Sequence, residues 1–298
     1  MEQPDAGQAK PASRIEATHQ WTKRTQEMLA HRAIKGLKFH RLYGLLRTKR
    51  LVWAALDKVL RSKGANTPGI DGVTKRDLLD SKAQAALVDE INRELCDKTY
   101  RPLPVRRVYV SEPGKAERRS LGIASIKDKI VQEMLRLVLE PIYEAKFHKH
   151  SYGFRPFRST HHAALRSKDL IGRRGYNWVI KGDICGCFDH IQQTKLLKVL
   201  RKTIKDERII WLVKAMLKAG CMEDGSWRVT DEGIPQGGIA SPLFANIYLN
   251  ELDWYVHEMW EGRSPSEKQR IKKNGGIPCF IVRYAEDFLA MVKGTKGQ

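Results

Sequence analysis

Three acidic residues stand where apolar segments end, and together they could bind divalent cations. Asp183 closes an apolar run that begins at Trp178, and Glu286 with Asp287 interrupts the apolar stretch Cys279–Val292. If these segments are neighbouring strands, the three carboxylates converge at one sheet edge and repel one another unless cations bind there. Mg²⁺ prefers such hard oxygen ligands, and two ions about 3.5–4 Å apart stabilise both oxygens that exchange in a phosphoryl transfer. The alternative is that these acids are ordinary exposed turn residues.

A glycine-rich turn precedes the last of these segments. Gln236 is flanked by Gly233, Gly237 and Gly238, and glycine lets a backbone approach a bound nucleotide closely because it has no Cβ. Such turns are common in proteins, so this one is weak evidence by itself.

The charge of the chain favours a nucleic-acid partner. Its 298 residues include 54 Lys and Arg against 34 Asp and Glu, which gives a net charge of +20 and a sequence pI of about 9.8. A surplus of this size commonly faces an acidic backbone, although a generally basic soluble protein would also show it. The 42% hydrophobic content argues against wholesale disorder.

Basic residues are concentrated near the start of the chain. Between Lys23 and Arg50, nine Lys or Arg accompany one acid, Glu27. The apolar residues follow helical spacing, which predicts two basic amphipathic helices. A solvated charged face is the alternative, but the asymmetry favours a phosphate-binding surface. The residues expected to bind RNA there are Lys23, Arg24, Arg32, Lys35, Lys38 and Arg41.

Cysteines and apolar runs bear on the cellular setting. The five cysteines are scattered without a CxxC pair, which disfavours a disulfide framework and a zinc site. Residues 1–14 are polar, unlike a signal peptide, and no run approaches the ~18 apolar residues of a membrane span. We expect a soluble cytoplasmic protein with no membrane partner.

The elements that must position these residues follow from local pattern. Residues 1–20 are predicted to form a disordered tail. Pro102–Val110 predicts a strand that a turn joins to a second, basic strand edge. Ser125 and Asp128 match a capping box, and Pro141 is expected to end the helix that follows. The second half is predicted to contain helices over 193–204, 206–219 and 242–255, an exposed loop over 262–276 and a hairpin over 279–292.

Several segments of the chain match known motifs in a fixed order. They are VRRVY with RSLGIA from Val105 and Arg119, YGFRPFRS from Tyr152, DICGCFDHI from Asp183, GIPQGGIASPLFANIYL from Gly233 and RYAEDF from Arg283. In this order they resemble the motifs of reverse transcriptases, most closely the group II intron reverse transcriptase/maturase family. The resemblance covers about residues 37–293.

The resemblance implies an RNA-directed DNA polymerase tied to a structured intron RNA. It would use an RNA template, a DNA primer, deoxynucleoside triphosphates and two Mg²⁺ ions, with Mn²⁺ as an alternative. The catalytic residues would be Asp183, Glu286 and Asp287, which would bind metal together with the Ile184 carbonyl. The nucleotide would contact Lys115, Arg119, Phe188 and Gln236, and the template would contact Tyr152, Phe154 and Arg155.

Some of these assignments leave two interpretations open. Phe188 would exclude a ribose 2′-hydroxyl by steric contact, or it is a plain core residue. Tyr152, Phe154 and Arg155 combine aromatic and basic character as template-contacting surfaces do, but they could equally form the edge of the core.

The chain departs from the family at its catalytic turn. Glu286 replaces the family's aspartate and adds a methylene, and a misplacement of about 1 Å can cost on the order of a hundredfold in rate. The family also continues with a helical thumb, which we expect this chain to lack. Two alternatives therefore stand beside the polymerase: a non-catalytic RNA-binding maturase-like remnant, and a reverse transcriptase with a non-intron role such as phage defence.

The expected fold is α+β. Residues 21–175 would form a basic helical extension and the fingers, with an inserted sheet. Residues 176–298 would form an incomplete palm, a split β-α-β (ferredoxin-like) sheet with helices on one face.

Overall fold

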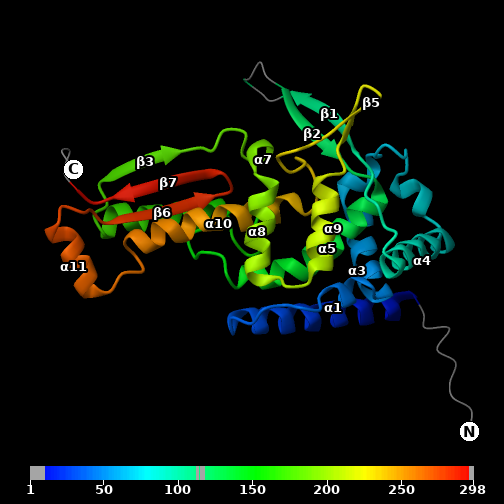
Figure 1. Cartoon of the computed structure of the whole chain (residues 1–298), viewed down its shortest axis with the longest axis horizontal. Coiled ribbons are helices and arrows are strands. Elements are labelled where there is room, and N and C mark those ends of the chain that lie inside the picture. The colour runs from blue at the N-terminus through cyan, green and yellow to red at the C-terminus, as the bar shows by residue number, and fades with distance from the viewer. Residues whose placement is uncertain (1–10, 112–113, 115–117, 295–298) are drawn as a thin grey trace, which may run out of the picture.

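The computed structural model describes residues 11–111, 114 and 118–294, so Lys115 lies outside the described part of the chain. Its helices are α1 (Pro11–Ile34), α2 (Tyr43–Leu46), α3 (Lys49–Arg61), α4 (Ser81–Asp97), α5 (Ile126–Glu144), α6 (Thr160–Lys168), α7 (Cys187–His190), α8 (Gln193–Thr203), α9 (Glu207–Leu217), α10 (Ser241–Met259) and α11 (Pro265–Lys273), with short turns η1 (Lys63–Asn66), η2 (Lys75–Leu78) and η3 (Asp169–Arg173). Its strands are β1 (Val105–Ser111), β2 (Arg118–Ile123), β3 (Trp178–Gly182), β4 (Cys221–Glu223), β5 (Ser226–Arg228), β6 (Cys279–Tyr284) and β7 (Asp287–Val292). The predicted α+β class is confirmed (Figure 1).

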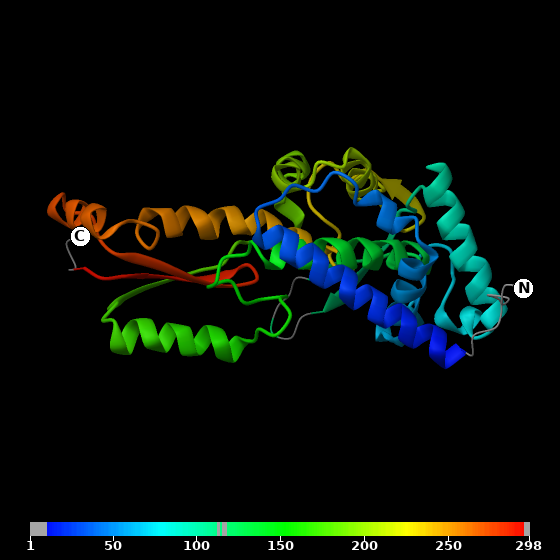
Figure 2. The ribbon, with the colours of Figure 1, turned by 90° about the horizontal axis from the view of Figure 1, so that it is seen from below.

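Helix α5 forms the centre of the larger hydrophobic core. Its side chains Ile130, Val131, Met134 and Leu135 are fully buried, because apolar residues at helical spacing cover most of its circumference. Helices α1 and α3 pack against it, and α8 and α9 contribute to the same core. Helix α1 lies along the base of this helical lobe (Figures 1 and 2).

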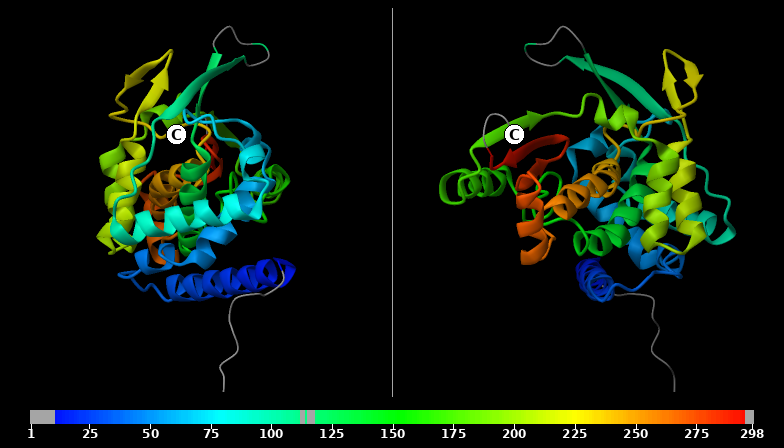
Figure 3. Two further views of the ribbon diagram at one scale, coloured as in Figure 1. Left: turned by 90° about the vertical axis from the view of Figure 1, so that its right-hand side faces the viewer. Right: turned by 60° about the vertical axis from the view of Figure 1, so that its left-hand side comes forward.

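A four-stranded sheet stands on the helical lobe, opposite α1. Its strand order is β2-β1-β4-β5, with β1 antiparallel to β2 and parallel to β4. Both hairpins project from the helices (Figure 3), and Tyr109 and Val110 are about half exposed. This sheet corresponds to the predicted sheet of the fingers.

A three-stranded sheet forms the predicted palm. Its order is β3-β7-β6 and both pairings are antiparallel, so β3 and β6 run parallel with β7 between them. Helix α10 lies in the connection between β3 and β6, and this is the split β-α-β arrangement that we predicted.

Helices cover both faces of β6, so the expectation of helices on one face is wrong for this strand. On one face, Arg283 bonds to Asp253 of α10. On the other face, Phe280 lies under Arg166 of α6 and packs with Leu170 in a second, smaller core. Alternate side chains of a strand point to opposite faces, and Figure 2 shows the sheet between these two helices.

The predicted boundary at residue 175 does not separate the two cores. Helices α8 and α9 follow it in sequence, yet they pack in the larger core, and β4 pairs with β1. Tyr152 and Leu170 precede it, yet they lie in the smaller core of the palm. The chain therefore passes between the two lobes more than once.

Pro141 does not end its helix as predicted. Helix α5 continues through Pro141 to Glu144. Proline cannot donate to the carbonyl four residues earlier, and that carbonyl, of Leu137, accepts a hydrogen bond from Gln26 Nε2 of α1 instead (3.0 Å). A tertiary contact thus satisfies the group that the proline frees.

Two segments predicted to lack structure are helical. Helix α1 begins at Pro11, so the disordered tail is wrong for residues 11–20, and residues 1–10 lie outside the described part. The predicted loop 262–276 contains α11, which Ser264 and Glu267 start with a reciprocal capping box. Among the described helices, none combines the length and the apolar character that crossing a bilayer needs.

Candidate active site

Strand pairing brings the distant acids to one end of the palm sheet. The last paired residues of β3 and β7 are Gly182 and Phe288, and the next residues along the two strands are Asp183 and Asp287. A Cβ on Gly182 would lie 2.1 Å from the Phe288 ring, so glycine is required for this close approach. β3 and β7 are thus neighbours, as convergence of the three acids requires.

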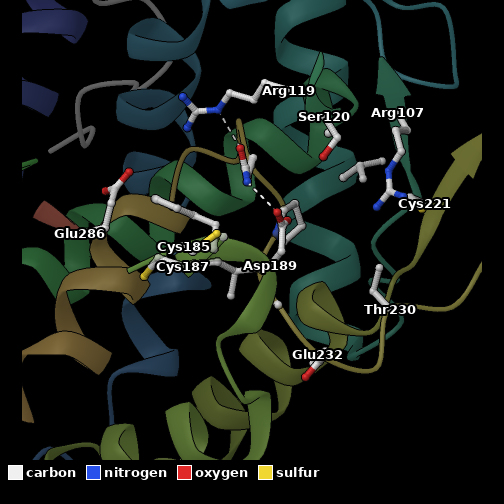
Figure 4. Close-up of a pocket in the computed structure, with 18 of the residues that line it drawn as sticks. Arg107, Arg119, Ser120, Cys185, Cys187, Asp189, Cys221, Thr230, Glu232 and Glu286 are labelled. Atoms are coloured by element: carbon white, nitrogen blue, oxygen red, sulfur yellow. Dashed lines mark hydrogen bonds between the residues drawn. The ribbon is translucent and has the colours of Figure 1, made fainter. Parts of the chain in front are cut away.

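The thiol of Cys187 lies within electrostatic reach of both Asp183 and Glu286. Burial raises the pKa of this thiol to about 11, and the negative charges of Glu286 and Asp183 contribute to the rise. Both acids therefore act on the same buried group. Figure 4 shows Glu286 beside Cys185 and Cys187.

The Glu286 turn is held from beneath by Arg283. This guanidinium is 0% exposed, as is its partner Asp253. Nε and Nη2 donate to the Asp253 carboxylate at 2.8 and 2.6 Å, and Nη1 donates to the carbonyl of Ala285 at 2.6 Å. Ser151 and Asn246 accept the remaining two donors. All five donors of the guanidinium are used, so the turn backbone has a defined position.

The turn also packs against a glycine from a distant segment. A Cβ on Gly153 would lie 2.2 Å from the Ala285 nitrogen, so only glycine fits beneath the turn. Ala285 has φ of +56°, a left-handed conformation that is costly for a residue with a side chain. Asn246 donates to the Gly153 carbonyl (2.8 Å) and accepts from Arg283. The YGFRPFRS and RYAEDF segments thus form one unit.

A cavity of about 740 Å³ opens between the palm and the fingers sheet. The predicted site residues that line it are Asp183, Ile184, Phe188, Arg119, Gln236 and Glu286. Asp287 is exposed at the start of β7. The Ile184 carbonyl accepts a hydrogen bond from the Cys187 amide (3.1 Å) and retains a second lone pair.

Gln236 connects the fingers sheet to the palm. Its Oε1 accepts from Arg119 Nε (2.8 Å) and its Nε2 donates to Asp189 Oδ2 (3.0 Å), as Figure 4 shows. The Gly122 amide of β2 donates to the Gln236 carbonyl (2.6 Å). At Gly237, with φ of +98°, a Cβ would meet the Gly122 carbonyl at 3.1 Å. The glycines therefore serve the close docking of this turn on β2.

Phe188 combines the two interpretations that its sequence position left open. Its side chain is 7% exposed and belongs to the larger core, yet it also lines the cavity. The Phe154 ring meets it edge-on, with centroids 6.2 Å apart. A ring fixed in this way could limit the space beside a sugar.

Two of the three predicted template residues form the edge of the core, which was the alternative to template contact. Tyr152 is buried, and Arg155 directs its guanidinium to Glu144 and to the carbonyls of His148 and Ser151. Phe154 is half exposed, and its template contact stays a prediction. Phe157 of the same YGFRPFRS motif, to which the sequence pattern assigns no role, is 99% exposed.

The predicted RNA-binding side chains of the N-terminal region are all exposed. Lys23, Arg24 and Arg32 lie on α1, and Lys35, Lys38 and Arg41 follow it. These side chains do not take part in the packing of α1 against α5, so they are available to bind phosphate. Contact with RNA stays a prediction.

Several functional candidates escaped the sequence analysis. Asp189 was quoted within a motif but given no role, although it accepts from Gln236. Arg283 was also quoted, but its partner Asp253 lies on α10 without any local sequence feature that marks it. Only the packing of α10 against β6 pairs these two residues.

Comparison with known proteins agrees with this geometry. A family model described as reverse transcriptase (RNA-dependent DNA polymerase) matches residues 110–297. Protein YkfC of Escherichia coli K12 is 39% identical over 88% of this chain and 73% of its own length. The group II intron-encoded protein LtrA of Lactococcus lactis is 36% identical over 87% of this chain and 49% of its own length.

The chain belongs to the group II intron reverse transcriptase/maturase family. It spans about half the length of LtrA. A chain of a Cas6-RT-Cas1–Cas2 complex has a TM-score of 0.51 at 22% identity, covering 85% of this chain and 38% of that one; at this identity it shows the fold alone. The term fingers therefore applies to the four-stranded sheet β2-β1-β4-β5, and the term palm applies to the three-stranded sheet β3-β7-β6 with its helices.

Proposed function

We propose that this chain catalyses RNA-templated DNA synthesis as the fingers and palm of a group II intron reverse transcriptase. One observation supports this most directly: Asp183 and Glu286 line the same cavity, together with Cys187. The opposite wall of that cavity contains Arg119 of β2. Such a cavity suits a nucleoside triphosphate: the basic residue would bind its phosphate oxygens, and the acids would hold the metal ions beside the reacting phosphorus.

The acidic residues fit divalent cations. Their carboxylates are hard oxygen donors, and the charges of Glu286 and Asp183 add to the rise that burial causes in the pKa of Cys187. Asp183, Glu286, Asp287 and the Ile184 carbonyl would hold the ions. When bound, Mg²⁺ would stabilise charge on the attacking and leaving oxygens.

The remaining wall residues would orient the nucleotide. Arg119 would donate to phosphate oxygens, as guanidinium groups commonly do. Phe188 would pack against the sugar and exclude a 2′-hydroxyl. Gln236 would hold Arg119 and Asp189 in place across the cavity. The basic residues of α1 would bind RNA phosphates outside the cavity.

Primer extension on an RNA template with Mg²⁺ tests this function. Glu286→Asp is expected to raise the rate by about tenfold to a hundredfold, because it returns the carboxylate to the family's position. Asp183→Asn should abolish extension. Its free energy of unfolding should equal that of the natural chain, which would show that the variant is folded. Extension that persists at the natural rate in Asp183→Asn would refute the proposed site.

Glu286 specifically favours a second candidate, an RNA-binding maturase-like protein with a weakened polymerase site. In that case the natural chain binds structured RNA but does not extend primers, and Glu286→Asp leaves RNA affinity unchanged. Gel-shift titrations of both proteins, run beside the extension assay, separate the two candidates.

A further inference from the structure

Two histidines and a glutamate converge at the end of α10, away from the acidic residues of the cavity. His148 lies between α5 and α6, and His257 and Glu261 are four residues apart. His257 Nδ1 lies 3.2 Å from both His148 Nε2 and Glu261 Oε2, and the last two atoms are 3.6 Å apart. The side chains of His148, His257 and Glu261 are 2%, 18% and 15% exposed, so the cluster is mostly buried but keeps some contact with solvent.

Hydrogen bonds can follow at most two of the three edges of this triangle. Each of its three atoms acts toward the others as a donor or as an acceptor. Around any triangle, at least one edge then joins two atoms of the same kind, which repel one another. A cation at the centre resolves the conflict, because all three atoms can then act as electron-pair donors.

The distances fit a tetrahedral metal ion. Zinc bonds of 2.0–2.2 Å to nitrogen and oxygen place neighbouring tetrahedral ligands about 3.3 Å apart, close to the separations in the cluster. We propose that His148, His257 and Glu261 form a zinc-binding site with one further position for water. The cysteines, whose spacing disfavoured zinc, take no part in it.

Groups around the cluster oppose the binding of a metal ion in two ways, through a hydrogen bond that is lost and through nearby positive charges. His148 Nδ1 accepts a weak hydrogen bond from the His150 amide (3.3 Å), which is lost when Nδ1 carries the proton and Nε2 binds metal. Lys149 Nζ contacts the other oxygen of Glu261, and His150 Nε2 lies 3.6 Å from that oxygen. Arg166 adds positive charge beside His150. These positive charges oppose any added cation, so the site suits an ion that binds imidazole strongly, as zinc does, rather than Mg²⁺.

The site would brace the palm. The segment that follows His148 pairs with β6, where the Arg283 amide donates to the His150 carbonyl (2.9 Å) and the Tyr152 amide donates to the Arg283 carbonyl (2.9 Å). A zinc ion would thus link α10 covalently, through coordinate bonds, to the segment that supports the Glu286 turn.

Metal titration of the purified full chain tests the site. The chain is freed of metal by chelator dialysis and titrated with Zn²⁺ against a chromophoric chelator, in excess Mg²⁺ so that the carboxylates of the cavity are occupied. We expect one equivalent to bind, and His257→Gln and Glu261→Gln to weaken it at least tenfold. The matched control His161→Gln changes an exposed histidine of α6 and should bind as the natural chain does.

Cobalt provides a readout that needs no variant. Co²⁺ in the site should show the intense visible bands of tetrahedral coordination without the near-ultraviolet thiolate bands that cysteine ligation produces. Absence of Zn²⁺ binding, thiolate bands at one equivalent of Co²⁺, or natural affinity in both His257→Gln and Glu261→Gln would each overturn the proposal.

Discussion

The palm wall and the fingers wall of the cavity support their polar residues differently. In the palm, the Arg283–Asp253 pair is fully buried and every guanidinium donor is bonded. Across the cavity, Arg119 of the fingers sheet is exposed, and it donates to Gln236, which in turn donates to the exposed Asp189 of α7 in the palm. Breaking a buried ion pair costs far more than breaking an exposed contact. The turn that presents Glu286 is therefore fixed, whereas the fingers wall can adjust to a nucleotide.

Removing the buried guanidinium should have the largest effect. Arg283→Met leaves the Asp253 carboxylate buried without a partner, and we expect unfolding free energy to fall by about 3–5 kcal/mol. Urea unfolding followed by circular dichroism measures it. Arg201→Met, in an exposed pair with Glu207, is the control and should cost less than about 1 kcal/mol.

A double variant sharpens this test. Arg283→Met combined with Asp253→Leu leaves no buried charge, so part of the lost stability should return. If Arg283→Met is as mild as Arg201→Met, the palm wall is not held by this pair and the comparison of the two walls fails.

Cysteine alkylation should show the next largest effect. Below pH 9 a thiol with a pKa of about 11 is ionised about a hundredfold less than one with the ordinary value of 9.0. Cys187 should therefore react with iodoacetamide much more slowly than the exposed Cys185, and its rate should rise with pH until about pH 11. Peptide mass spectrometry follows both sites.

Glu286→Gln makes this test specific to the acidic residues. Loss of the carboxylate charge removes one cause of the raised pKa, so the pKa of Cys187 falls and alkylation at pH 8 becomes faster. An unchanged rate would mean that Glu286 lies too far from Cys187 to share a site with Asp183.

The smallest effect is expected at the fingers wall. Gln236→Ala removes two hydrogen bonds to charged groups, and we expect the KM for the nucleotide to rise about tenfold with little loss of stability. Steady-state primer extension measures KM and kcat separately. Gln192→Ala, at an exposed position before α8, is the control. A fall in stability like that of Arg283→Met would show that the two walls are equally rigid.

The strands next to Asp183 and Asp287 are predictable from the sequence, because apolar runs and turns are local features. The hairpin of β6 and β7 and the capped start of α5 at Ser125 are confirmed for the same reason. Helix α11 was predictable as well, since Ser264 and Glu267 form the capping box that the sequence displays. Pro141 was not, because the Gln26 contact that keeps α5 helical comes from a distant helix.

The sequence by itself determined the chemistry available to this protein: carboxylates at strand ends, glycines beside Gln236, and a strong basic surplus. Only the tertiary structure decided which groups meet. It buried Tyr152 in the smaller core and Arg155 against Glu144, paired Arg283 with Asp253, and gathered His148, His257 and Glu261 at the end of α10. The physical reason is that local pattern depends on neighbours in the chain, whereas burial and charge pairing depend on the packing of helices against sheets, which joins residues far apart in sequence.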